Sequence, residues 1–124
     1  MNFKNQSFSK SLSNALRGIK VSIGSERNLK IQLTIMILLT VLGLILKFSP
    51  MEWGIIALTS AIVISTEMIN TAIEITVDMV CQENFNTFAR NAKDVAAGAV
   101  LIVSIASVIV GAIIILPKII NLIK

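Results

Sequence analysis

Three long apolar blocks dominate the chain, and short polar segments separate them. Residues 31–46, 53–66 and 95–116 contain no charged side chain. A helix over the last block rises about 33 Å at about 1.5 Å per residue, which is enough to cross about 30 Å of hydrocarbon. The pattern therefore predicts an all-α integral membrane fold. Its three transmembrane helices are expected over residues 26–48, 51–80 and 92–116.

Turn and interface residues mark the ends of these helices. Ser49-Pro50 breaks the first helix, since proline has a fixed φ and lacks a backbone N–H. Trp53 is favoured at a membrane–water interface, so the turn is expected at one membrane surface. We expect a polar connection over residues 82–91 before the third helix. That helix is expected to end at Pro117, with the tail of residues 118–124 outside the membrane.

A shorter helical stripe precedes the first apolar block. Apolar residues recur there at three- or four-residue steps, while polar and basic residues lie largely opposite. The stripe predicts an N-terminal amphipathic surface helix over residues 6–23, lying in the membrane interface. A helix packed over the other segments is an alternative that the same stripe allows. The apolar positions are Phe8, Leu12, Ala15, Leu16, Ile19 and Ile23.

The composition excludes a water-soluble globule and supports a single membrane-embedded domain over residues 1–124. Hydrophobic residues make up 55% of the chain, and Tyr and His are absent. The single cysteine, Cys81, cannot form a disulfide within the chain. We interpret it as incidental.

The basic residues are distributed unevenly about the apolar blocks. Of the eleven Lys and Arg residues, six precede the first block, two lie between the second and third blocks, and three lie elsewhere. Because basic residues favour the cytoplasmic side, we expect the N-terminus and the connection of residues 79–94 in the bacterial cytoplasm. The net charge of +4 therefore indicates topology and contact with anionic lipid. No nucleic-acid partner is expected.

Four polar side chains share one face of the second predicted helix. They are Glu67, Asn70, Glu74 and Asp78. At about 100° per residue, all four fall within an arc of about 80°. Counted from Trp53, Glu67 lies about 21 Å and Glu74 about 31 Å along the helix axis. The stripe therefore leads from cytoplasmic water to the depth of a lipid hydroxyl.

Acids at this depth favour a functional site over a structural seam. An ionisable group inside the membrane costs roughly 3 kcal/mol on insertion scales, and like charges at i, i+4 repel. No Lys or Arg lies between Trp53 and Cys81 to compensate. Oxygen ligands at a wet interface suit Mg²⁺, usually together with substrate phosphates. A polar seam that holds helices together is the alternative, most of all for Asn70.

Two further polar positions are expected on the same side of the membrane. Glu26 begins the first transmembrane helix, and Lys93-Asp94 begins the third, where helix-terminal N–H groups and a lysine can face an anion. An ordinary first-turn acid and a topology charge are the alternatives for Asp94 and Lys93. The chain contains neither G-x-x-x-x-G-K-[ST] nor G-x-G-x-x-G, which excludes the standard nucleotide-binding loops.

The motif on the second helix resembles the signature of the prokaryotic diacylglycerol kinases and their undecaprenol kinase relatives. That signature, E-x-x-N-[ST]-A-I-E-x-x-V-D followed by A-K-D, is matched by residues 67–78 and 92–94. Glu26 and Arg17-Gly18 also fit the family. The resemblance implies a homotrimer of three-helix subunits with active sites shared between neighbours. It also implies an enzyme that uses ATP and Mg²⁺ to phosphorylate a membrane lipid hydroxyl.

The resemblance further implies a role for each matching residue. Glu67 looks like the general base on the lipid hydroxyl, and Glu26 and Glu74 look like the ligands of Mg²⁺–ATP. Asp78 is similar to a supporting acid beside the nucleotide. The other expected nucleotide or phosphate contacts are Arg17, Asn70, Lys93 and Asp94.

Some positions depart from the best-known branch of the family. Its histidine in the loop before A-K-D is absent, with Asn86 or a neighbour in its place, and Gln32 stands where that branch has an acid. Residues 94–101 look like the Gram-positive branch, whose preferred substrate is undecaprenol. We therefore favour undecaprenol over diacylglycerol as the acceptor.

Two other classes of function compete with a lipid kinase. A small transporter that uses membrane acids as proton or cation sites would carry its polar stripe through the bilayer midplane, whereas this stripe ends short of it. A structural or pore-forming peptide would carry small and hydroxyl residues where the acids are.

Overall fold

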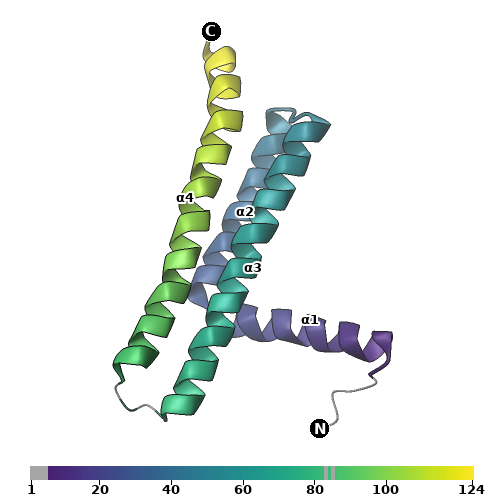
Figure 1. Cartoon of the computed structure of the whole chain (residues 1–124). Helices are drawn as coiled ribbons and strands as arrows, with labels where there is room; N and C mark the ends of the chain where they lie inside the picture. The colour runs from purple at the N-terminus through teal and green to yellow at the C-terminus, as the bar shows by residue number, and fades with distance from the viewer. Residues whose placement is uncertain (1–5, 83, 85) are drawn as a thin grey trace.

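The protein is all-helical throughout the part of the chain that the structure describes. The structure is a computed structural model of residues 6–82, 84 and 86–124, so residues 83 and 85 of the expected polar connection lie outside the described residues. Figure 1 shows α2, α3 and α4 side by side, with α1 lying across them at the start of α2 and with α3 and α4 extending beyond it. The helices are α1 (Phe8–Ser25), α2 (Arg27–Ile45), α3 (Pro50–Cys81) and α4 (Thr87–Ile123).

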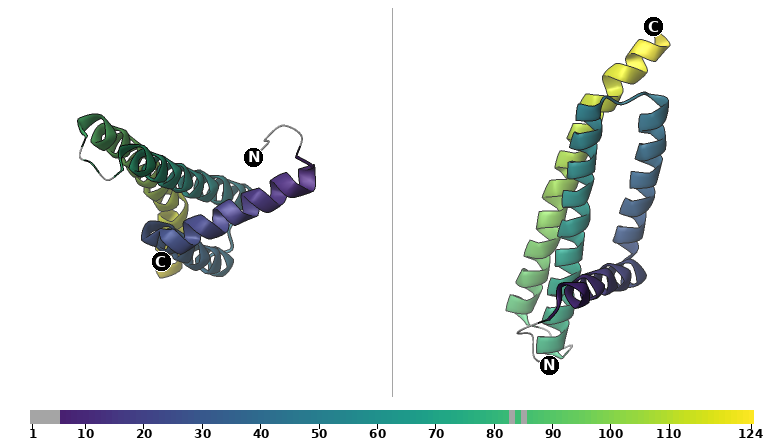
Figure 2. Two further views of the ribbon diagram at one scale, coloured as in Figure 1. Left: turned by 90° about the horizontal axis from the view of Figure 1, so that it is seen from below. Right: turned by 90° about the vertical axis from the view of Figure 1, so that its right-hand side faces the viewer.

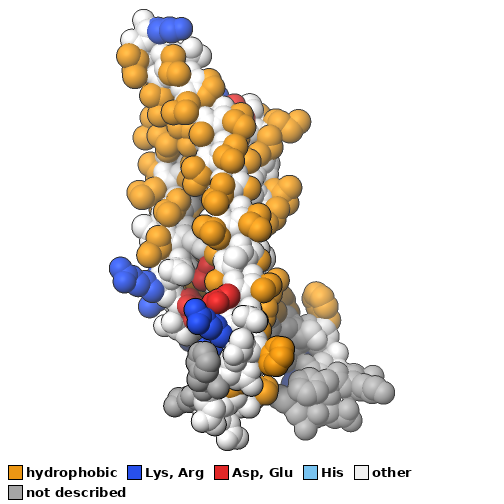
Figure 3. All heavy atoms as spheres, turned by 60° about the vertical axis from the view of Figure 1, so that its left-hand side comes forward, with side chains coloured by type: hydrophobic (Ala, Val, Ile, Leu, Met, Phe, Trp, Pro, Cys, Tyr) orange, Lys and Arg blue, Asp and Glu red, His pale blue; other side chains and the backbone are white. Residues whose placement is uncertain are grey.

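Three of these helices, α2, α3 and α4, are long and apolar enough to cross a membrane, which confirms the prediction of three such helices. With 19, 32 and 37 residues, they rise about 28, 48 and 55 Å. Apolar side chains cover the middle of the bundle, and most charges gather toward one end (Figure 3). We call this the charged end; it holds α1, the start of α2 and the α3–α4 connection. The opposite end, with the α2–α3 turn, is the turn end.

The turn between α2 and α3 is longer than the sequence indicated, because it takes up the last residues expected in the first transmembrane helix. α2 ends at Ile45 instead of residue 48, because Lys47 adopts a left-handed backbone with φ 55°. The chain reverses there, and the Phe48 N–H donates to the Gly43 carbonyl at 3.0 Å. Phe48 is 6% exposed, so burial of its ring holds the turn against the bundle.

Ser49 and Glu52 fix the first residue of α3. The Glu52 N–H donates to Ser49 Oγ at 3.2 Å, and the Ser49 N–H donates to Glu52 Oε2 at 2.7 Å. This reciprocal capping box satisfies two N–H groups that have no helical partner. Pro50 follows at a position where a missing N–H costs nothing. The Ser49-Pro50 pair therefore begins α3 as well as interrupting α2.

The fourth helix is longer than expected at both ends. It begins at Thr87 instead of residue 92, because Asn86 Oδ1 accepts from the Phe88 N–H at 2.8 Å and caps an additional first turn. It also continues through Pro117 to Ile123. This corrects the expected end at Pro117 and the separate tail. A proline removes one helical hydrogen bond, and the long apolar helix continues despite that loss.

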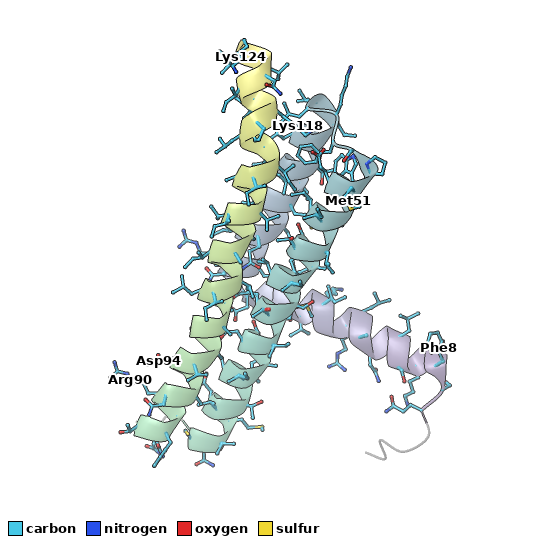
Figure 4. All side chains as sticks on the ribbon, turned by 45° about the horizontal axis from the view of Figure 1, so that its top comes forward. Phe8, Met51, Arg90, Asp94, Lys118 and Lys124 are labelled. Atoms are coloured by element: carbon cyan, nitrogen blue, oxygen red, sulfur yellow. The ribbon has the colours of Figure 1, made fainter. Side chains whose placement is uncertain are left out.

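A buried cluster around Phe48 and an ion pair join α4 to the turn end. The rings of Phe48 and Trp53 lie with their centroids 5.3 Å apart, and Phe48 packs in the same buried cluster as Ile114 of α4. Lys118 Nζ lies 2.9 Å from Glu52 Oε2, with both side chains about a quarter exposed (Figure 4). One carboxylate thus caps α3 and also holds α4.

Threonine hydroxyls within the bundle are satisfied inside their own helices. Six of them donate to the carbonyl four residues earlier, at 2.7–3.0 Å: Thr34, Thr40, Thr59, Thr66, Thr71 and Thr76. An unpaired hydroxyl in hydrocarbon would cost free energy. These bonds therefore allow threonine in a spanning helix without a partner on another helix.

Gly43 provides a test of the packing at the turn end. A Cβ there would lie 2.7 Å from Trp53 Cη2 and 2.8 Å from Phe48 Cδ2, closer than carbon atoms pack. We expect Gly43→Ala to lower the free energy of unfolding by about 1–3 kcal/mol, measured by thermal unfolding in detergent. Gly54→Ala is the matched control, because nothing lies within 4 Å of its Cβ. Equal stability of the two variants would contradict this packing.

Candidate active site

The polar stripe of α3 runs from the charged end into the bundle. Asp78 is exposed, Glu74 is half-buried, and Asn70 and Glu67 are buried. The exposed fraction falls to 7% at Asn70 and 1% at Glu67. Burial within the protein therefore deepens along the stripe toward the middle of α3.

Gln32 on α2 holds one oxygen of the Glu67 carboxylate. Its Nε2 donates to Glu67 Oε2 at 3.1 Å. The other oxygen, Oε1, is buried and has no hydrogen-bond partner among the described residues. Thr71 Oγ1 donates to the backbone carbonyl of Glu67 and leaves the carboxylate untouched. One side of the carboxylate is therefore fixed and the other is free.

Asn70 connects the buried part of the stripe to its half-buried part. Its Nδ2 donates to Glu74 Oε1 at 3.3 Å, so its hydrogen-bond partner lies on its own helix instead of on a neighbouring one. Asn70 Oδ1, Glu67 Oε1 and Gln32 Oε1 are all buried without a partner in the described part of the chain. Folded proteins pair such atoms with protein, water or ligand. These three acceptors therefore mark a place for a hydrogen-bond donor.

Glu26 lies between α1 and α2, close enough to the stripe to interact electrostatically with Glu74 and Glu67. Its backbone N–H donates to the Ser22 carbonyl at 3.0 Å, while its side chain makes no capping bond to α2. Burial raises the pKa of the Glu26 carboxyl above its ordinary value, and the charges of Glu74 and then Glu67 raise this pKa further. Three acids from two segments therefore share one negative region.

Lys93 at the start of α4 supplies a cation to the outer part of the stripe. Its Nζ donates to Asp78 Oδ1 and forms an ion pair with it. Asp94 instead pairs with Arg90 at 3.6 Å, with both side chains 68% exposed, on the outer face of α4 (Figure 4). Within one chain, Lys93 meets the stripe and Asp94 does not.

Arg17 also lies apart from the acids. It is an exposed residue of α1, and α1 extends away from the bundle (Figure 2). Among the described residues, no ion pair links Arg17 to an acid. Arg17 and Asp94 are thus the two expected site residues that a single chain does not bring to the stripe.

Gln32 is the site residue that the sequence analysis did not assign. Its signal was a lone amide near the start of an apolar block, which is costly in a membrane unless it is hydrogen-bonded. That signal does not say which helix the amide faces. The packing of α2 against α3 supplies this information.

A groove opens beside Glu67 between α2 and α4. It has a volume of about 330 Å³ and is lined by Asn28, Ile31 and Gln32, by Glu67, and by residues 97–104 of α4. An apolar cavity of about 310 Å³ continues toward the turn end and shares Gln32 and Ser104 with the groove. Together they suit a long lipid with its polar group beside Glu67 and its tail in the apolar part.

The acids fit a metal–nucleotide complex better than a bare metal ion. No three Asp, Glu, His or Cys side chains of the described residues converge closely enough to hold a metal by themselves. Mg²⁺ usually takes one or two protein carboxylates and completes its shell with water and phosphate oxygens. The charges of Glu74 and Glu67 repel that of Glu26, and a cation bound between these acids would relieve the repulsion. Glu26 and Glu74 therefore fit this mode of binding.

Known proteins resemble this chain along most of its length. A family model described as prokaryotic diacylglycerol kinase matches residues 13–115. An undecaprenol kinase of Bacillus subtilis is 39% identical over 111 residues, which cover 90% of this chain and 89% of that relative. A diacylglycerol kinase of Synechocystis is 34% identical over 108 residues, or 87% of this chain. This chain spans 62% of the Synechocystis protein's length.

The shared negative charge predicts how Glu26 affects stability. A folded-state pKa above the unfolded value means that ionised Glu26 destabilises the fold, so stability is lost as the pH rises through the folded pKa. Without metal and nucleotide, Glu26→Gln is expected to raise Tm slightly at pH ~8, and less near pH ~4. Thermal unfolding in detergent by circular dichroism measures this difference.

Glu52→Gln is the contrasting control, because Glu52 pairs with Lys118 and caps α3. Its Tm should fall at neutral pH. A wild-type protein more stable than Glu26→Gln at pH ~8 would show that Glu26 makes a favourable contact in place of the repulsion.

Proposed function

This chain belongs to the prokaryotic diacylglycerol kinase family, and from this membership we propose that it transfers the γ-phosphate of ATP to a membrane lipid hydroxyl with Mg²⁺. Both relatives named above are lipid kinases. The observation that carries the proposal is the buried Glu67 carboxylate, whose Oε1 has no described partner and whose side chain lines a groove of about 330 Å³.

Glu67 is the residue that we assign as general base. A base must lie within hydrogen-bond reach of the proton that it accepts. Because Gln32 occupies Oε2, a lipid hydroxyl in the groove would donate to Oε1. Glu67 is only 1% exposed, which limits the access of water as a competing acceptor.

The phosphates are assigned to the outer part of the stripe. Glu26 and Glu74 would hold Mg²⁺, which neutralises phosphate charge when bound. Asn70 would orient Glu74 through the bond from its Nδ2. Lys93 is the cation nearest the stripe and would exchange its contact with Asp78 for a phosphate, leaving Asp78 as a supporting acid.

A homotrimer accounts for the two expected site residues that lie apart. Arg17 and Asp94 are exposed and do not reach the acids of their own chain. If active sites are shared between subunits, these side chains reach the nucleotide of a neighbour. Many large apolar side chains of α2, α3 and α4 are more than half exposed, so the single chain also leaves surface for contacts with both lipid and further subunits.

Undecaprenol is the acceptor that we favour, with diacylglycerol as the alternative. The Bacillus subtilis relative is named for undecaprenol and is matched over 89% of its length. The cavity beyond Gln32 is lined mainly by apolar residues of three helices, and a polyprenyl tail has no polar atoms to satisfy there. We assign the charged end to the cytoplasm, with α1 lying on the membrane surface, because cellular ATP is cytoplasmic and basic residues favour that side.

The function is tested on the purified protein in mixed micelles with [γ-³²P]ATP. We expect Mg²⁺-dependent phosphorylation of undecaprenol in preference to diacylglycerol. Glu67→Gln should lower kcat by about 10²- to 10⁴-fold, the range for loss of a general base. Glu74→Gln should raise the Mg²⁺–ATP concentration needed for half-maximal rate. A wild-type rate in Glu67→Gln would exclude it as the base.

Thr76→Val is the matched control for these variants. Thr76 lies on α3 between Glu74 and Asp78, and its hydroxyl donates to the Ala72 carbonyl of its own helix at 2.7 Å. Its loss should leave kcat and KM close to wild type. A defect equal to that of Glu74→Gln would indicate a general disturbance of α3.

Sidedness has a separate test in a Cys81→Ala background. Met51 at the turn end and Asn84 at the charged end are both exposed, so each is replaced by cysteine in turn. A membrane-impermeant maleimide added to spheroplasts should label position 51 only, and position 84 only after permeabilisation. The reverse pattern would place the acids on the side away from cytoplasmic ATP.

A further inference from the structure

Gln32 is a half-buried residue with a buried amide oxygen, and the assigned roles give it no part in the reaction beyond its contact with Glu67. We propose that Gln32 is a positioning residue that holds Oε2 of Glu67, so that Oε1 alone is presented to the lipid hydroxyl. The inference rests on the proposed function, because it presupposes that Glu67 acts on that hydroxyl.

The contact itself is the first support. Gln32 Nε2 donates to Glu67 Oε2 at 3.1 Å across 35 residues of sequence. No other side-chain hydrogen bond joins α2 to α3 within residues 6–82. The amide orientation is defined, because a flipped amide would place Gln32 Oε1 against a carboxylate oxygen. The packing of α2 against α3 therefore fixes the place of one oxygen of the Glu67 carboxylate.

Among the described residues, no cationic side chain donates a hydrogen bond to the Glu67 carboxylate in place of Gln32. Glu26, ahead of α2, and Glu74, on the same helix, are both negative and interact across this region. The wall that α4 contributes to the groove, within residues 97–104, is uncharged. Lys93, further out, pairs with Asp78. A neutral amide is thus the donor that the described residues provide for this carboxylate.

The chemistry of the amide suits this role. The terminal torsion of a glutamate is broad and roughly two-fold, so a carboxylate without a donor samples several orientations. A donor on another helix removes that freedom. Because an amide N–H does not titrate, Gln32 fixes Oε2 without competing for the proton that Oε1 is to accept. Positioning of this kind affects the chemical step more than nucleotide binding.

Two variants of similar size test the proposal in the full-length protein in mixed micelles. Gln32→Met keeps the length of the side chain and removes the donor, and Gln32→Leu removes the donor with a branched apolar side chain. Each is expected to lower kcat by about 10- to 100-fold, as for loss of a hydrogen bond to a charged group. The KM for Mg²⁺–ATP should stay at the wild-type value, since Gln32 is not assigned to the nucleotide.

Thr34→Val is the control on the same helix. Thr34 is exposed, and its hydroxyl donates to the Lys30 carbonyl of its own helix at 2.9 Å. The double variant Gln32→Met with Glu67→Gln should be no slower than Glu67→Gln alone, because a positioning residue has no effect once its target is absent. Circular dichroism establishes folding, and if Gln32→Met does not fold, Gln32→Leu decides the outcome.

Three results would overturn the inference. They are a wild-type kcat in the folded Gln32 variant, a loss of kcat matched by a proportional rise in the KM for Mg²⁺–ATP, and additive losses in the double variant. If Glu67→Gln is inactive while both Gln32 variants are fully active, only the positioning role fails. If Glu67→Gln itself works at the wild-type rate, the proposed function fails and this inference fails with it.

Discussion

The burial of one carboxylate within an apolar helix bundle is the constraint on which the rest of this structure depends. Glu67 is 1% exposed, and an ionised acid in such surroundings is strongly destabilising unless it is hydrogen-bonded or neutralised. The described residues meet this cost in part, through a single amide on the neighbouring helix. The remaining oxygen and the two unpartnered acceptors beside it keep the site polar inside a hydrophobic protein. Under the proposed function, this polar place inside the bundle would receive the hydroxyl of a lipid that stays in the membrane.

The hairpin of α2 and α3 sets the register of that contact. Gln32 lies 13 residues before the last residue of α2, and Glu67 lies 17 residues after the first residue of α3. Because the two helices leave one turn in opposite chain directions, these positions lie at similar distances from the turn, and the two long side chains meet. The left-handed Lys47, the capping box at Ser49 and the buried Phe48 ring hold the turn that defines this alignment. The turn end thereby determines geometry at the active site.

The sequence alone predicted the parts of the structure that depend on local pattern. Three apolar blocks predicted three helices of membrane-spanning length, and the 3.6-residue period predicted that Glu67, Asn70 and Glu74 share one face of the second of these helices. The family resemblance was confirmed by the match over residues 13–115.

The parts that it missed depend on contacts between segments or on competing local signals. Pro117 was expected to end α4, but a proline costs a single hydrogen bond in an otherwise favourable apolar helix. Asn86 looked like part of a loop, and its capping bond to Phe88 N extends the helix instead. The partners of Gln32 and Asp94 could not be derived from spacing, because tertiary packing decides which side chains meet.

The unequal lengths of the helices determine how far the outer acids of α3 extend beyond the start of α2. α2 has 19 residues and α3 has 32, and both leave the same turn, so α3 overshoots α2 by 13 residues, or about 20 Å. α4 accompanies it, and the two form a pillar beyond the start of α2 (Figure 1). Glu67 lies beside the start of this pillar and Asp78 lies further along it, so under the proposed roles the length of α3 sets the distance between the lipid hydroxyl and the phosphates. Each added residue also turns the helix by about 100°. A change in the length between Glu67 and Asp78 therefore keeps both side chains on one face of α3 only in steps close to whole helical turns.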